Sequence, residues 1–136
     1  MNNEIIGISF GLLLPILTLY NRKAKWLNSK VTWLTFFVFL SYGLYGLLYL
    51  KPILKNDKIF YFGFCIPIIY WIFDRFFKFL SIKINNRDFI LYLRNSNEID
   101  NSLFGKNPHV DILDIVFSIS LLAIICISLL IGVTRF

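Results

Sequence analysis

The sequence predicts an all-α integral membrane protein that folds as a four-helix transmembrane bundle. Hydrophobic residues make up 57% of the chain and charged residues only 16%, whereas soluble domains hold about 45–50% and about 25%. The apolar residues gather in four runs, and the basic residues lie mostly in the connections between them. A chain of 136 residues has room for one domain, and a domain this small cannot enclose so much apolar surface. We therefore expect residues 1–136 to form a single polytopic membrane domain.

Two of the four runs are long enough to span a bilayer without any further argument. Residues 31–50 contain no charged side chain, and neither do residues 115–133. A helix rises about 1.5 Å per residue, so about twenty residues cross a hydrocarbon core of about 30 Å. We expect spans at residues 31–50 and 112–134.

The run at residues 5–20 is shorter and contains Pro15. We expect a retained span rather than a cleaved signal peptide, because Arg22 and Lys23 follow the run instead of preceding it. A helix of this length would rely on its polar flanks or on local thinning of the bilayer.

The third run, at residues 59–80, is interrupted by Asp74 and Arg75. We expect a helix that leaves the hydrocarbon core near Phe73 and continues through the headgroups, with its cations reaching toward water. Gly63 and Pro67 predict a kink in it. A re-entrant segment is the alternative, and it would need protein or water around its backbone.

The distribution of basic residues predicts the orientation. Placing the first connection (residues 21–30) and the third (residues 81–111, with the end of the third span) inside puts ten Lys and Arg inside and four outside. Cytoplasmic connections carry the excess of these residues. We expect a protein of the plasma (inner) membrane with both termini outside and loops 21–30 and 81–111 in the cytoplasm.

The connection at residues 81–111 is the only long polar segment. Residues 80–84 alternate with period two, Asn85 and Asn86 can form a turn, and residues 89–93 resemble a strand. This pattern allows a short β-hairpin packed on the membrane face.

His109, Asp111 and Asp114 form the most suggestive polar cluster, at the start of the last span. A proton-accepting pair, a cation site or a general base could be built from them. We favour a structural interpretation, in which the acidic residues complement the helix dipole and Asp111 caps the helix. Arg75 and Lys78 lie three residues apart at the matching end of the third span, and we expect them to pair with Asp111 and Asp114.

Small residues indicate where helices approach one another. Gly7 and Gly11 are four residues apart, as are Ser128 and Gly132, and such pairs mark helix contacts within a bundle or between copies. A basic run, Arg22, Lys23 and Lys25, is expected to face anionic lipid.

No motif in the sequence predicts an enzyme, a cofactor or a metal site, since a lone His beside two Asp lacks the ligand number and spacing of a zinc site. The net charge of +6 does not predict nucleic-acid binding, because its cations lie in loops rather than on one face with aromatic residues.

Three classes of function remain. We favour a small accessory protein that binds another membrane protein in an assembly, regulatory or immunity role. The alternative is a homo-oligomeric pore or small transporter, although no span carries a polar stripe. A membrane enzyme that uses His109, Asp111 and Asp114 is the third.

Overall fold

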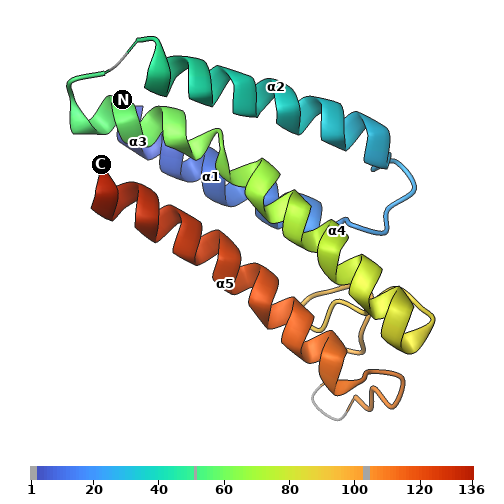
Figure 1. Ribbon diagram of the computed structural model, residues 1–136. Helices are drawn as coiled ribbons and strands as arrows, with labels where there is room; N and C mark the ends of the chain where they lie inside the picture. The colour runs from blue at the N-terminus through green and yellow to red at the C-terminus, as the bar shows by residue number, and fades with distance from the viewer. Residues whose placement is uncertain (1–2, 51, 103–104) are drawn as a thin grey trace.

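The computed structural model describes residues 3–50, 52–102 and 105–136. In this part of the chain it contains five helical segments: α1 (Asn3–Tyr20), α2 (Ser29–Leu48), α3 (Lys55–Gly63), α4 (Ile66–Asn85) and α5 (Ile112–Arg135). The segments α3 and α4 follow each other along one rod (Figure 1). The result is a bundle of four long rods.

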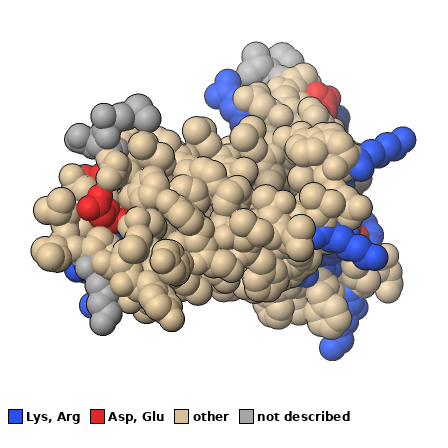
Figure 2. Space-filling view, turned by 90° about the horizontal axis from the view of Figure 1, so that it is seen from above, with Lys and Arg blue, Asp and Glu red and all other residues tan. Residues whose placement is uncertain are grey.

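All four rods are long and apolar enough to cross a membrane, and they comprise residues 3–20, 29–48, 55–85 and 112–135. On the face shown in Figure 2, charged side chains gather toward the two ends and leave the middle uncharged. An uncharged belt is what the hydrocarbon core of a bilayer requires. The predicted all-α fold with four candidate spans is therefore confirmed.

The third rod breaks between Gly63 and Ile66, at the predicted kink. The amide of Phe64 donates to the Tyr61 carbonyl and the amide of Cys65 to the Phe62 carbonyl, so the chain tightens before α4 begins. Pro67 lies in the first turn of α4, where its missing N–H costs no hydrogen bond. Beyond the break the rod continues along the bundle instead of turning back (Figure 1), as a spanning helix would.

Glycines let α1 and α3 approach at backbone distance. A Cβ placed on Gly7 would lie 2.5 Å from the Cα of Phe60, and one on Gly63 would overlap the carbonyl group of Gly7. Gly11 faces Gly63 and the Ile66 side chain in the same seam. On α5, Ser128 is buried and a Cβ on Gly132 would lie 2.5 Å from the ring of Phe62. These small residues thus make contacts inside one bundle.

The two ends of the bundle differ. Both chain termini lie at one end (Figure 1), together with the connection from α2 to α3. The other end carries the connection between α1 and α2 and the segment between α4 and α5, and we call it the network end. The helix α2 lies at the edge of the bundle, where it packs mainly on α3 and α4.

The β-hairpin is not supported, because the described residues contain no strand. Asn86 ends α4 in the left-handed conformation, with φ of 55°, and the chain then runs without regular secondary structure through residues 88–92. The alternation is real, since Phe89 and Leu91 are fully buried in the core. The neighbours of this segment are helices rather than a second strand, so its backbone groups pair with side chains.

Candidate functional site

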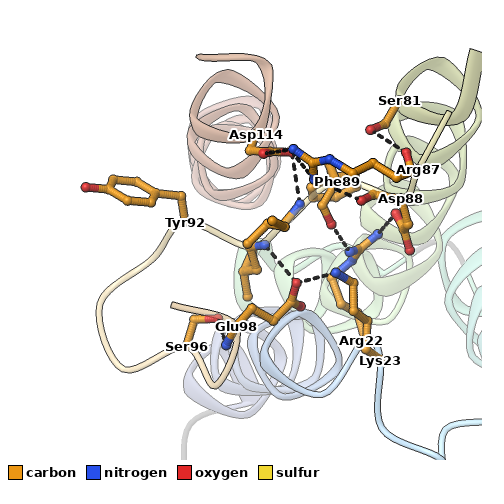
Figure 3. A network of polar contacts seen from close by, with 12 residues as sticks. Arg22, Lys23, Ser81, Arg87, Asp88, Phe89, Tyr92, Ser96, Glu98 and Asp114 are labelled. Carbon is orange, nitrogen blue, oxygen red and sulfur yellow. Dashed lines mark hydrogen bonds and ion pairs between the residues drawn. The ribbon is translucent and has the colours of Figure 1, made fainter. Parts of the chain in front are cut away.

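The network end is built around a buried arginine. The guanidinium of Arg22 donates through Nε to Asp74 at 3.0 Å, through Nη1 to the Phe89 carbonyl at 3.0 Å and through Nη2 to Asp88 at 2.9 Å. Its side chain is 1% exposed, and that of Asp74 is not exposed at all. Figure 3 shows Arg22 reaching toward Asp88 and Phe89 among the surrounding helices.

Local structure explains how Arg22 comes to point inward. Because α1 ends at Tyr20 and the amide of Arg22 donates to the Leu19 carbonyl, the chain curls back over the end of its own helix. The guanidinium then lies 3.7 Å above the centre of the Phe89 ring, a cation–π contact that favours a desolvated cation.

Burial and ion pairing act in opposite directions on Arg22. Burial alone lowers the pKa of this guanidinium, but the carboxylates of Asp74 and Asp88 outweigh burial and raise the pKa above its ordinary value. The cation is therefore held charged inside the protein. Buried ion pairs persist only where geometry and hydrogen bonding compensate for desolvation, and here three acceptors do so.

Asp74 serves two cations. Its second carboxylate oxygen accepts from Nη2 of Arg75 at 2.7 Å, and the Arg75 guanidinium lies 4.0 Å above the Trp71 ring. The Nζ atom of Lys78 lies 3.7 Å from the Oδ2 atom of Asp88, the second carboxylate that Arg22 contacts. Arg75 and Lys78 of α4 are thus paired with carboxylates of α4 itself and of the segment that follows it.

A second arginine, Arg87, ties that segment to α5. Its Nη2 donates at 2.8 Å to both Asp111 and Asp114 and at 3.2 Å to the His109 carbonyl. The hydrogen bond to Asp114 is the main reason why the pKa of Arg87 is raised. Asp111 is the N-cap of α5, and its amide donates to the Asp114 carboxylate at 2.9 Å.

Side chains of three helices complete the backbone hydrogen bonds of residues 87–98, which we call the cap segment. From α5, Asp114 accepts from the Ile90 amide at 3.0 Å and Ser118 accepts from the Tyr92 amide at 2.9 Å.

The other contacts of the cap segment come from α4 and from the end of α1. Ser81 of α4 donates to the Arg87 carbonyl at 2.9 Å, and Tyr20 of α1 donates to the Arg94 carbonyl at 3.0 Å. Lys23, which follows α1, pairs with Glu98, and Glu98 also accepts from the amide of Leu91 at 3.0 Å. The cap segment is therefore part of the folded core, although it has no regular secondary structure (Figure 3).

The predicted ion pairs between the third and the last span were wrong about the partners. Asp111 and Asp114 pair with Arg87, whereas Arg75 pairs with Asp74 and Lys78 with Asp88. The physical reason is the cap segment, which lies between α4 and α5 and brings its own arginine to the acidic pair. His109 is exposed, and its ring contacts the Glu98 carbonyl at 3.5 Å.

The basic run is also corrected. Arg22 is buried and Lys23 is paired, so within this run only Lys25 is left as an exposed cation with no carboxylate partner among the described residues. Sequence reasoning missed the roles of Asp74, Arg87, Asp88 and Glu98. The position of Asp74 was a usable signal, because a carboxylate next to an apolar run requires a partner.

In this arrangement each buried cation is paired with carboxylates, and the hydrogen bonds of these groups hold the cap segment in place. Its chemistry is that of a structural clamp. Over residues 3–50, 52–102 and 105–136, no group of three or more His, Cys, Asp and Glu side chains is placed to hold a metal ion. Comparisons with protein-family models, with curated proteins and with solved structures find no match to this chain.

Proposed function

We propose that this chain is a small non-enzymatic membrane protein that acts by binding a partner membrane protein, in an accessory, assembly or immunity role. The observation that carries the proposal is the ion network, which fixes the cap segment in one shape. Burying Arg22, Asp74 and Asp114 is costly, and an inert lipid anchor would gain nothing from it. A preformed surface at the membrane face lowers the ordering cost of binding a partner.

The orientation of the proposed surface follows from charge. Ten of the fourteen Lys and Arg lie in residues 21–30 or 75–106, on the side of the network end. The excess of these residues favours the cytoplasmic side. In our proposal the cap segment therefore faces the cytoplasm from the plasma (inner) membrane, and both termini lie on the opposite side.

Two exposed surfaces suit a partner. In the cap segment the Tyr92 side chain points away from the helices (Figure 3) and is 39% exposed. Within the uncharged belt, the edge helix α2 presents Leu34, Val38 and Tyr45, which are 70%, 60% and 54% exposed. Interfaces are enriched in tyrosine, since its ring offers large contact area at little entropic cost and its hydroxyl takes a hydrogen bond.

Site-specific photocrosslinking tests the proposal in the native membrane. A photoreactive residue at Tyr92 or at Tyr45 is expected to give one discrete adduct with a second protein. The matched control is Ile119 of α5, which is 57% exposed and outside both surfaces. Equal labelling from all three positions would contradict a specific partner. A ladder of self-adducts would instead favour the homo-oligomeric pore.

A further inference from the structure

An apolar groove runs between α1 and α2 at the network end. It has a volume of about 300 Å³ and continues along α1 into a second hollow of about 410 Å³, with Leu14 and Leu17 lining both. Ligand pockets in proteins usually measure about 300–1,000 Å³. The groove opens sideways from the bundle, so in a membrane its occupant would enter from the lipid.

The walls of the groove need no polar partner. Three threonines contribute to them, Thr18, Thr32 and Thr35, and each hydroxyl donates to a carbonyl of its own helix at 2.9–3.0 Å. The remaining lining comes mostly from Leu, Val and aromatic side chains. A hydrocarbon chain fits such a surface, whereas a polar ligand would lose hydrogen bonds there.

The mouth of the groove is positively charged. Trp26 lines it and is 70% exposed, as expected of an aromatic residue at the headgroup level. Lys25 and Lys30 lie on either side of it in the chain, are exposed, and pair with no carboxylate in the described residues. No Asp or Glu occurs between Glu4 and Asp57. The N-terminus of α2, at Ser29, adds the positive end of a helix dipole.

From the apolar walls and this charged mouth we infer that the groove binds one anionic phospholipid of the bilayer. Its acyl chains lie between α1 and α2, and its phosphate lies against Lys25, Lys30 and the start of α2. This inference does not depend on the proposed protein partner, because it is argued from Leu14, Leu17 and Trp26 of the lining and from the two lysines, none of which belongs to the surfaces proposed for that partner.

Native mass spectrometry of the full chain, released from nanodiscs of equal phosphatidylglycerol and phosphatidylcholine, tests the inference. The protein is expected to retain phosphatidylglycerol in preference. Each lysine near a headgroup contributes about 1 kcal/mol, so Lys25→Gln or Lys30→Gln should lower that retention about fivefold. The matched control is Lys55→Gln with Lys58→Gln, which removes two cations from the opposite end.

A second pair of variants separates the groove from general charge attraction. Val31 lines the groove and Leu44 does not; both are exposed on α2. Val31→Trp is expected to fill the groove and abolish retention of the lipid, whereas Leu44→Trp leaves it unchanged. Equal retention of the two lipids, equal loss in the Lys55 and Lys58 control, or retention that survives Val31→Trp would overturn the inference. A protein dimer that Val31→Trp dissociates would overturn it as well, by assigning the groove to a second copy.

Discussion

The Nε atom of Arg22 lies 3.0 Å from the Oδ1 atom of Asp74, and the two side chains are 1% and 0% exposed. These residues are 52 positions apart in the sequence. Their ion pair joins the end of α1 to the middle of α4 and, through Asp88 and the Phe89 carbonyl, to the cap segment. The stability of the network end therefore depends on charges that a lipid-exposed helix could not tolerate.

Removing one partner of this pair should be strongly destabilising. Arg22→Met leaves Asp74 buried with only Arg75, and Asp74→Leu leaves Arg22 without its deepest acceptor. We expect each change to lower the free energy of unfolding by about 3–5 kcal/mol, measured by reversible unfolding in mixed micelles. The double variant should recover part of the loss, because no buried charge is left alone at this position. Arg94→Met, which removes an exposed arginine of the cap segment, is the control and should have little effect.

The hydrogen bond from the Tyr92 amide to Ser118 gives a local test of the cap segment. Ser118→Ala leaves this amide without its acceptor, at a cost of about 1–3 kcal/mol. Amide hydrogen exchange of residues 90–92 should therefore accelerate by about tenfold to a hundredfold. Ser120→Ala, two residues along the same helix, should leave the exchange unchanged. Equal exchange in wild type and Ser118→Ala would show that the cap segment is held by other contacts.

The seam between α1 and α3 should not accept a side chain at Gly63. A Cβ there would overlap the Gly7 carbonyl group, and both partners are backbone, so neither can turn away. We expect Gly63→Ala to lower the free energy of unfolding by about 1–3 kcal/mol or more, as overpacked cores do. Ser41→Ala on the exposed side of α2 serves as the comparison. A neutral or stabilising effect at Gly63 would mean that α1 and α3 are farther apart than described.

The pH dependence of the clamp should reflect its arginines. The pKa of Arg87 is raised, chiefly by the hydrogen bond to Asp114. A raised pKa stabilises the fold fully below the unfolded-state value and loses that contribution only as the pH rises through the folded-state value. The contribution of the pair between Arg87 and Asp114 should therefore persist between about pH 8 and pH 11, since arginine loses its proton only above that range.

Arg87→Lys supplies the comparison for the alkaline prediction. Lysine has an ordinary pKa of about 10.4, so the variant should begin to lose its ion pair with Asp114 above that pH. The measurement is hydrogen exchange of residues 90–92, corrected for the intrinsic effect of pH. Parallel curves for the two proteins would contradict a charge-based clamp at Arg87.

The spans could be read from the sequence because lipid imposes a simple rule on long uncharged runs. The break at Gly63 and Pro67 was also predictable, since both residue types weaken a helix at fixed places. The close helix contacts of Gly7 and Gly132 follow from the same local logic. Each of these features depends on residues near one another in the chain.

The network was not predictable from such local patterns. The local sequence does not tell whether a loop arginine stays at the surface and fixes topology or turns inward, as Arg22 does. The partner of Asp114 was misassigned because Arg75, Lys78 and Arg87 were all plausible partners. Only the path of the cap segment selects Arg87. The alternation at Phe89 and Leu91 suggested a strand, but it could not reveal that side chains of α5 accept the hydrogen bonds that a second strand would accept.

The mass and composition of the native complex test directly whether this protein acts by binding a partner membrane protein. The complex would be extracted gently from the native membrane, weighed and its proteins identified. We predict a defined assembly that contains this chain together with a different membrane protein. The variant Arg22→Met, which loosens the cap segment, should weaken this assembly. A closed ring of identical copies would contradict the account and point to a pore.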